Sequence, residues 1–296
     1  MRRGAEIEAI VSADICASGS YLSRLKFPKV RGVQVEDNEK PSFARAVGGI
    51  SSNVITTSSA GLSTSFIKLP CGETAFVARP EQGGTRPVIL LAHEIFGLHE
   101  HILDLARRLA REGYLVIAPD YLSRYGDIAA APSIDALRLI VARASDSITL
   151  ATFDEAFEAA INYRGDLQRV AMTGYCWGGR IVWLYSAHNA KIRACVPWYG
   201  RLDGERTSQQ ECWPIDLAGQ LKVPTLGLYG GADPTIPREL IKKFQKQLLK
   251  HNAPAEIKIY DDAPHGFCAD YRDTYRPGAA KQAWREMCAF FKRHHV

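Results

Sequence analysis

The chain contains 296 residues, of which 46% are hydrophobic and 23% are charged, and its net charge at pH 7 is +5. A chain of this length and composition can bury a large core, and we expect one α/β domain with an extension. Its Lys and Arg residues are spread along the sequence without a basic run interleaved with aromatic residues, which argues against a nucleic-acid partner. No apolar run approaches the roughly 20 residues of a membrane span, so we expect no membrane partner either.

The seven cysteines favour a reducing compartment. Their number is odd and no two have C-x-x-C spacing, so neither a disulfide framework nor a structural zinc site is expected. Arg2 and Arg3 lie at the start of the chain, but no hydrophobic stretch follows them as a secretory signal requires. We therefore expect a cytoplasmic protein, and the sequence leaves open whether it is a monomer or a small homo-oligomer.

Residues 1–60 differ from the rest of the chain, because they combine weak periodicity with many Ser, Gly and charged residues and no clear strand. We interpret them as an N-terminal arm that is partly disordered or packed on the surface. From about residue 61 the pattern becomes regular, and residues 61–296 are predicted to form the α/β domain.

Strands and helices alternate along the predicted domain. In chain order we expect an edge strand at 74–78 ended by Pro80, a strand at 87–92, a helix at 101–109 stopped by Gly113, a strand at 114–119, a helix at 147–163, strands at 170–175, 192–198, 225–229 and 257–260, and helices near 238–250 and 280–293. This alternation predicts a mainly parallel sheet with helices on both faces. Catalytic groups of such a sheet lie at the carboxyl ends of its strands.

The segment Gly174–Gly179 (GYCWGG) is the most informative of these strand ends. It lies between an apolar run and a predicted helix, and its small–x–nucleophile–x–Gly pattern is typical of a nucleophile elbow. Cys176 occupies the nucleophile position. The free N–H groups and the dipole of the following helix favour a thiolate there.

Two later strand ends supply the partners that a thiol nucleophile needs. Asp233 follows a strand and a glycine turn, and His265 lies just after the predicted strand at 257–260. Nucleophile, then acid, then histidine is the chain order of α/β-hydrolases. We predict that His265 takes the proton of Cys176 and that Asp233 fixes the imidazole tautomer.

An oxyanion hole is expected at two backbone amides. The N–H of Trp177 follows the nucleophile, and the N–H of Ile95 belongs to the segment after the strand at 87–92. Glu94 in that segment is unexpected, because a carboxylate at the end of a buried strand costs free energy unless it is paired. A hydrogen bond to the Cys176 thiol or to a nearby arginine would explain it.

Several motifs in one order resemble the dienelactone hydrolase (carboxymethylenebutenolidase) family, which has an α/β-hydrolase fold. The likeness runs from about residue 62 to the C-terminus, and its motifs are His93–Gly97 (HEIFG), Ala118–Tyr121 (APDY), Gly174–Gly179, Tyr229–Asp233 (YGGAD) and His265–Phe267 (HGF). The resemblance implies a Cys-His-Asp hydrolase of small lactones or esters. It also implies that Glu94 holds the resting thiol until substrate displaces it, so that Cys176 is a guarded nucleophile.

The resemblance further implies that arginines bind a substrate carboxylate. Arg138 lies where one family arginine would fall, whereas the second has no match and Arg272 is the candidate substitute. Phe96 and Tyr121 are candidates for an apolar substrate wall. The missing match leaves open a carboxylesterase for neutral or bulkier esters.

Other readings of the same residues remain as alternatives. His93, Glu94 and His99 do not have the spacing of an H-E-x-x-H zinc site, and we expect neither a metal nor a cofactor. A non-catalytic binding protein of the same fold would carry a broken triad, and no triad position is broken here. Arg138 and Arg272 are equally compatible with ordinary solvated surface residues.

Overall fold

The computed structural model describes residues 34–35 and 54–296, which all belong to one compact unit from Arg31 to Val296. Most of the predicted N-terminal arm, residues 1–33 and 36–53, lies outside the described residues. Within the arm, Gln34–Val35 form a short strand where the sequence indicated none, and residues 54–60 form neither helix nor strand.

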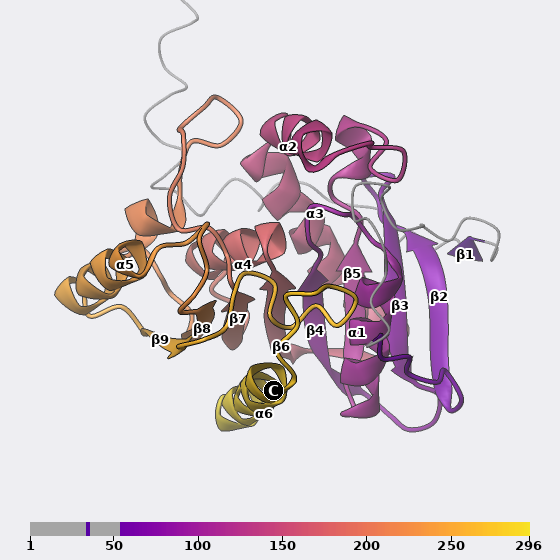
Figure 1. Cartoon of the computed structure of the whole chain (residues 1–296). Helices are drawn as coiled ribbons and strands as arrows, with labels where there is room; N and C mark the ends of the chain where they lie inside the picture. Colours follow the sequence, from indigo (N-terminus) through magenta and orange to yellow (C-terminus); the bar gives the residue numbers. More distant parts are fainter. Residues whose placement is uncertain (1–33, 36–53) are drawn as a thin grey trace, which may run out of the picture. The chain divides into compact units, whose positions relative to one another are not determined.

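Strands and helices alternate through the unit as the sequence predicts (Figure 1). The strands are β1 (Gln34–Val35), β2 (Leu62–Lys68), β3 (Thr74–Pro80), β4 (Arg86–Ala92), β5 (Leu115–Pro119), β6 (Gly165–Tyr175), β7 (Ala194–Trp198), β8 (Thr225–Gly230) and β9 (Ala255–Tyr260). The α-helices are α1 (Glu100–Arg111), α2 (Ile134–Ala142), α3 (Asp146–Ala159), α4 (Trp177–His188), α5 (Arg238–Lys250) and α6 (Pro277–Arg293). Short 3₁₀ helices are η3 (Ser123–Tyr125), η4 (Ala160–Tyr163) and η5 (Pro214–Leu217).

The nine described strands form one sheet in the order β1-β2-β3-β5-β4-β6-β7-β8-β9. From β5 to β9 every neighbouring pair is parallel, whereas β1, β2 and β3 pair antiparallel at the other edge. The predicted mainly parallel α/β sheet is therefore confirmed. Parallel pairing brings the carboxyl ends of β4, β6, β8 and β9 to the same edge of the sheet.

The prediction of an edge strand at 74–78 was wrong in its position. The strand is β3, and it lies between β2 and β5 with hydrogen bonds on both sides. The sequence of β2, LSTSFIK, contains three hydroxyl residues and shows only weak alternation, so the true outer strands were not recognised. The helix predicted at 147–163 also ends earlier, because α3 stops at Ala159 and a 3₁₀ turn completes the segment.

Strand β4 illustrates how the sheet is buried on both faces. Ile89 and Leu91 belong to a core cluster shared with α1 and α6, while Val88 and Leu90 belong to a second cluster shared with α2 and α3. Helices α1 and α6 contribute to the first cluster, while α3 and α4 pack against β4 and contribute to the second. Burial of successive residues on opposite faces explains why the strand is a continuous apolar run.

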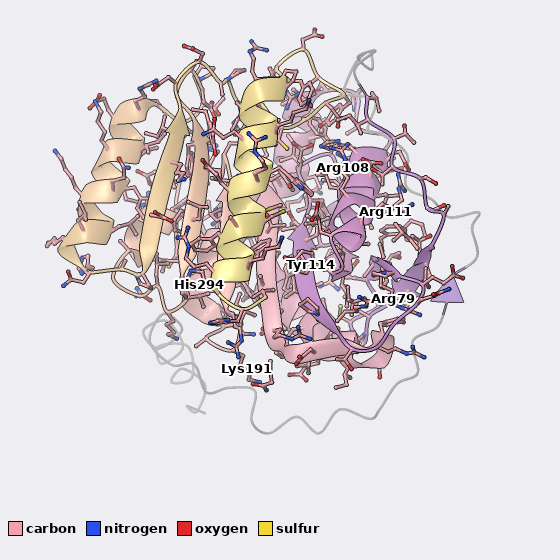
Figure 2. All side chains as sticks on the ribbon, turned by 90° about the horizontal axis from the view of Figure 1, so that it is seen from below. Arg79, Arg108, Arg111, Tyr114, Lys191 and His294 are labelled. Atoms are coloured by element: carbon pink, nitrogen blue, oxygen red, sulfur yellow. The ribbon has the colours of Figure 1, made fainter. Side chains whose placement is uncertain are left out.

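The segment before β2 is held against α1 by polar contacts. The backbone N–H of Thr57 donates to Asp104, and Arg111 donates to the carbonyl oxygens of Ser58 and Ala60. Arg108 and Arg111 project from α1 (Figure 2). Among the helices of residues 54–296, none combines the length and the apolar character needed to span a bilayer.

Candidate active site

Cys176 lies at a strained turn between β6 and α4. Its φ of 54° and ψ of −114° place a non-glycine residue in a rarely populated region of backbone space, and its N–H donates to the Trp198 carbonyl at 3.0 Å. The start of α4 packs closely against the end of β4. A Cβ on Gly178 would lie 2.3 Å from the Ala92 carbonyl oxygen and 2.5 Å from that of His93. Glycine at this position lets the turn form, as the elbow pattern predicts.

His265 and Asp233 meet at the carboxyl ends of β9 and β8. The His265 Nδ1 lies 2.7 Å from the Asp233 Oδ2, and the other carboxylate oxygen accepts hydrogen bonds from the N–H and the hydroxyl of Thr235 at 2.7 Å each. Burial alone would lower the pKa of His265, but the charge and hydrogen bond of Cys176 and the bond to Asp233 outweigh burial and raise that pKa to about 10. The structure thus brings Cys176, His265 and Asp233 together in the order in which a thiol, a base and its orienting acid would act.

The two predicted oxyanion donors are backbone amides without a competing acceptor. Trp177 is the first residue of α4, and Ile95 lies in the turn after β4. No acceptor in residues 54–296 takes a backbone hydrogen bond from either amide. Both N–H groups are therefore available to a developing negative charge.

Glu94 is buried, and its pairing differs from the two expected alternatives. Its Oε2 accepts a 2.6 Å hydrogen bond from the Tyr271 hydroxyl and lies 3.4 Å from the His99 Nε2. Burial would raise the pKa of Glu94, but the hydrogen bond to His99 and the charges around it, including that of Arg272, lower the pKa to about 2. Glu94 is thus an anion, held by a tyrosine and a histidine that the sequence analysis did not single out.

The two candidate arginines have different positions. Arg272 is half-buried, and its guanidinium lies 5.6 Å from the centre of the Phe96 ring. Burial opposes its charge, but the charges of Glu94, Tyr271 and Cys176 raise its pKa. Arg138 instead lies on α2 with 69% of its side chain exposed and pairs with Asp135 one turn earlier. Only Arg272 is therefore placed beside the candidate nucleophile, and the expected contact of Arg138 with substrate has no support in the structure.

Tyr121 is buried beside the site, but its polar end is already bound. Its hydroxyl donates to the His93 carbonyl oxygen at 2.6 Å, and its ring stacks on the His93 imidazole with the ring centres 4.1 Å apart. Burial and, next, the charge of Cys176 raise its pKa well above the usual value. Tyr121 thus fixes the backbone that leads to Glu94, and with only 1% of its surface exposed it presents no open face to a substrate in this structure. Its predicted contact with substrate stays a prediction.

Arg180, one turn after Cys176, is a buried residue that the sequence analysis missed. Its guanidinium donates two hydrogen bonds to Asp146 at 2.6 and 2.7 Å and a third to the Cys212 carbonyl at 2.8 Å. It also lies between the rings of Trp177 and Trp213, 4.6 and 4.3 Å from their centres. These hydrogen bonds and ring contacts hold Arg180 in place and fix the first turn of α4. The sequence marks Arg180 only by its charge on an otherwise apolar helix.

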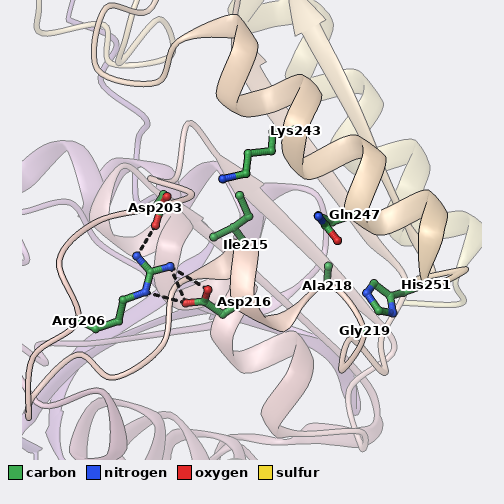
Figure 3. Close-up of a pocket in the computed structure, with 9 residues that line it drawn as sticks. All are labelled: Asp203, Arg206, Ile215, Asp216, Ala218, Gly219, Lys243, Gln247 and His251. Atoms are coloured by element: carbon green, nitrogen blue, oxygen red, sulfur yellow. Dashed lines mark hydrogen bonds and ion pairs between the residues drawn. The ribbon is translucent and has the colours of Figure 1, made fainter.

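Cavities in the described part of the chain differ in their relation to this site. One of about 620 Å³ is bounded by Phe96, Ile128 and the residues around η3. A smaller one of about 310 Å³ lies between η5 and α5, where Arg206 is paired with Asp203 and Asp216 (Figure 3). The first cavity shares the Phe96 wall with Arg272, and the lining of neither cavity includes Cys176, Asp233 or His265.

No group of three or more His, Cys, Asp or Glu side chains in the described part of the chain is arranged to hold a metal ion.

Known proteins similar to this chain share both its sequence and its fold. The sequence model of the dienelactone hydrolase family matches residues 74–295. A protein of Escherichia coli K12 named "Putative carboxymethylenebutenolidase" is 42% identical over 263 residues, which cover 86% of this chain and 96% of the relative. A protein of Methylorubrum extorquens with the same name is 38% identical and covers 86% of this chain and 89% of its own length.

Solved structures agree with this relationship. The crystal structure titled as a "Putative Dienelactone Hydrolase" from Klebsiella pneumoniae is 42% identical, has a TM-score of 0.77, and covers 78% of this chain and 98% of that one. An acylaminoacyl peptidase of Pyrococcus horikoshii, 15% identical with a TM-score of 0.63, covers 81% of this chain and 44% of that one and shows the fold alone. The predicted α/β-hydrolase fold and the predicted resemblance are both confirmed: the chain belongs to the dienelactone hydrolase family, whose members hydrolyse ester bonds.

Proposed function

We propose that this protein hydrolyses small lactones or esters, of the dienelactone kind, through a thioester formed on Cys176. The observation that carries the proposal is the strained Cys176 turn facing the His265–Asp233 pair, whose ring nitrogen and carboxylate oxygen are 2.7 Å apart. Membership of a family of ester hydrolases supports the same reaction type.

The first half of the reaction forms the acyl enzyme. The Cys176 proton moves to His265, and the thiolate sulfur bonds to the substrate carbonyl carbon. The carbonyl oxygen becomes an oxyanion, which accepts hydrogen bonds from the amides of Ile95 and Trp177. When the C–O bond of the ester breaks, the imidazolium of His265 returns its proton to the leaving oxygen. In a lactone that oxygen stays on the acyl group.

The second half releases the product. A water molecule then takes the place of the leaving oxygen next to His265. His265 accepts a proton from this water, and the water oxygen bonds to the thioester carbonyl carbon. The same two amides stabilise the second oxyanion. The C–S bond then breaks, and the thiolate and imidazolium are restored while Asp233 holds the imidazole orientation throughout.

The direct test is hydrolysis of a small aryl ester and of a dienelactone by purified wild-type protein and by Cys176→Ala. We expect turnover in the wild type, a covalent acyl adduct on Cys176 by mass spectrometry, and loss of both in the variant. Cys288→Ala is the matched control, because Cys288 lies on α6 away from the elbow. Undiminished activity of Cys176→Ala would refute the proposal.

A second candidate function is a carboxylesterase for neutral or bulkier esters. The exposed position of Arg138, paired with Asp135, favours it, because Arg272 would then be the one of the two candidate arginines that a substrate carboxylate meets. A matched pair of substrates that differ only in one carboxylate separates the candidates. If kcat/KM is higher for the neutral substrate, and Arg272→Gln does not change that preference, the neutral ester is the natural class.

A further inference from the structure

His93 is a fully buried histidine that the proposed mechanism does not use. It directly follows β4 and directly precedes Glu94, whose peptide bond to Ile95 carries one of the two candidate oxyanion amides. A buried polar ring costs free energy unless it is hydrogen-bonded. The hydrogen bonds of His93 therefore indicate what the residue does.

The His93 imidazole binds the peptide unit that follows Glu94. Its Nδ1 lies 2.7 Å from the carbonyl oxygen of Glu94. A carbonyl oxygen can only accept a hydrogen bond, so Nδ1 carries a hydrogen and donates it. The same oxygen accepts a second hydrogen bond from the N–H of Gly97 at 3.2 Å, and the two donors together occupy both of its lone pairs.

Fixing this carbonyl also fixes the oxyanion amide. The peptide bond between Glu94 and Ile95 is trans, and a trans peptide unit is planar with its C=O and N–H pointing in opposite directions. The Glu94 carbonyl and the Ile95 N–H are the two ends of this unit. A rotation that turned the N–H to a new direction would therefore break the hydrogen bond to His93.

The segment that carries this peptide lies against the start of the nucleophile's helix. Ala92 pairs with Gly174 in the parallel register of β4 and β6, and Glu94 and Cys176 each lie two residues beyond these partners. A Cβ on Gly178 would lie 2.5 Å from the carbonyl oxygen that precedes Glu94. The Glu94–Ile95 peptide thus follows a backbone stretch in direct contact with the first turn of α4.

The ring of His93 is itself held by the end of β5. It stacks on the Tyr121 ring, with the ring centres 4.1 Å apart and the planes 14° apart, and the Tyr121 hydroxyl donates to the His93 carbonyl oxygen at 2.6 Å. Its Nε2 accepts the N–H of Tyr121 at 3.4 Å and lies 3.6 Å from the Asp120 carboxylate. An Nε2 that accepts agrees with a hydrogen on Nδ1.

Asp120 is in turn fixed by Ser123. Its Oδ2 accepts the Ser123 hydroxyl at 2.6 Å, and its Oδ1 accepts the Ser123 N–H at 3.1 Å. Burial would raise the pKa of Asp120, but the interaction with His93 and the bonds from Ser123 lower it. Asp120 and Tyr121 belong to the APDY motif, for which the proposed mechanism gives no role.

We propose that His93, held by Asp120 and Tyr121, is a positioning residue that aims the Ile95 amide at the oxyanion. The inference rests on the proposed function and deepens it, because it assigns a support to one donor of the oxyanion hole. A donor that is already oriented stabilises the developing charge more than one that must rotate during the reaction.

The test compares two replacements of His93 in the full-length protein. His93→Phe keeps a ring to stack on Tyr121 but removes the donor, and His93→Asn places an amide N–H near the position of Nδ1. Loss of a whole oxyanion donor lowers kcat by about 10²- to 10³-fold, so a misdirected donor should cost about 10- to 100-fold. We expect this loss in kcat of His93→Phe with KM changed by less than about twofold, and recovery of most of it in His93→Asn.

The matched control is His188→Phe. His188 lies at the other end of α4 and pairs with Asp154, so this variant removes a histidine without touching the oxyanion amides. It should keep the kinetics of the wild type. Wild-type kcat in His93→Phe would overturn the proposal.

Two reagents for the Cys176 thiol separate positioning from general damage to the site. When the sulfur adds to the carbonyl carbon of a trifluoromethyl ketone, the carbonyl oxygen becomes an oxyanion. When it displaces iodide from iodoacetamide, no oxyanion forms. At about pH 9, above the usual pKa of a free thiol, His93→Phe should be alkylated as fast as the wild type but bind the ketone about tenfold or more weakly. An equal loss with both reagents would overturn the proposal.

A measurement on the wild type covers the case in which His93→Phe does not fold. The ¹⁵N NMR signals of the His93 ring are identified by their loss in His93→Asn. A protonated Nδ1 supports the proposal, whereas an Nδ1 without a hydrogen overturns it, because such a nitrogen cannot hold the Glu94 carbonyl.

The ketone also lets the two proposals fail separately. A wild type that forms the ketone adduct but hydrolyses no ester refutes the hydrolase proposal, and a weaker adduct in His93→Phe still supports the role of His93. Ester turnover that His93→Phe retains in full refutes the role of His93 alone. A wild type with neither adduct nor turnover overturns both.

Discussion

The imidazole of His265 pairs with the carboxylate of Asp233, and its tautomer depends on that partner. Its Nδ1 lies 2.7 Å from the Asp233 Oδ2, which leaves the other ring nitrogen for the thiol and for the reacting oxygens. Asp233→Asn keeps the shape of the side chain but removes the charge and can favour the wrong tautomer. We expect kcat/KM for a small ester to fall by about 10³- to 10⁴-fold, as in hydrolases of this general design.

The control for this prediction is Asp262→Asn, which changes an exposed aspartate three residues before His265. It should retain wild-type kinetics. A loss of less than about tenfold in Asp233→Asn would mean that the orientation of His265 does not depend on this carboxylate.

Glu94 should also make the stability of the protein sensitive to acid. Its pKa is lowered from 4.5 to about 2 in the folded state. Between these pH values the unfolded chain binds a proton that the folded chain does not. The contribution of Glu94 to the free energy of unfolding is therefore complete above pH 4.5 and falls as pH drops toward 2. His99 has the same effect at higher pH. Burial lowers its pKa from 6.5 to about 4, so its contribution to the free energy of unfolding falls as pH drops from 6.5 to 4.

Urea unfolding across this pH range checks the prediction. Glu94→Gln should show a flatter decline than the wild type just below pH 4.5, where the carboxyl of the unfolded wild-type chain becomes protonated. Because Glu94 raises the pKa of His99 against burial, the variant should also continue its His99-dependent decline to lower pH than the wild type does. Parallel curves between about pH 4.5 and 4 would contradict an ionised Glu94 in the folded state.

At the scale of elements, the contact between β4 and the start of α4 determines whether the elbow can form. A Cβ on Gly178 would lie 2.3 Å from the Ala92 carbonyl oxygen, and the obstacle is backbone of a central strand, which cannot move aside as a side chain can. We expect Gly178→Ala to destabilise the protein by about 1–3 kcal/mol or more and to lower activity in parallel. Gly84→Ala serves as the control in chemical unfolding, because a Cβ there meets nothing within 4 Å. Equal stabilities would contradict the argument.

The elements that the sequence predicted well are those with a local cause. Strand β4 was found because it is buried on both faces, and the turn at Cys176 was found because its glycines are demanded by close backbone contacts. Strand β3 was wrongly placed at an edge, because its neighbour β2 offers only a half-buried pattern of hydroxyl residues. Local pattern thus predicts which segments form strands, while the order of strands at the antiparallel edge depends on pairing partners that no local pattern encodes.

The residues of the candidate site also divide into those that local sequence pattern predicts and those whose partners come from distant parts of the chain. Cys176, Asp233 and His265 each follow a strand, so their meeting was predictable from parallel pairing. The partner of Glu94 was not, because Tyr271 lies 177 residues away in a loop without regular structure. The contrast between Arg272, beside the thiol, and Arg138, on an exposed helix face, likewise depends on where a loop folds back.

At the scale of the whole molecule, the fold assigns different environments to chemically identical thiols. Cys71, Cys176, Cys195, Cys268 and Cys288 are free thiols in the described part of the chain. Cys195, Cys268 and Cys288 are buried in the core, where burial raises the pKa of Cys268 and of Cys288 to about 12 each and that of Cys195 further still. Burial also raises the pKa of Cys71, which lies near Glu73 and Glu155.

These environments predict selective labelling of the native protein. Near neutral pH, a brief exposure to iodoacetamide followed by peptide mass spectrometry should find Cys176 modified before Cys71, Cys195, Cys268 and Cys288. His265 can accept the proton of Cys176, whereas burial raises the pKa of each of the other four thiols. In denaturant these five should react at similar rates, since the unfolded chain removes those differences. Faster labelling of Cys71 than of Cys176 in the native state would show that the fold does not activate the elbow thiol, and the strained turn would then need a structural explanation.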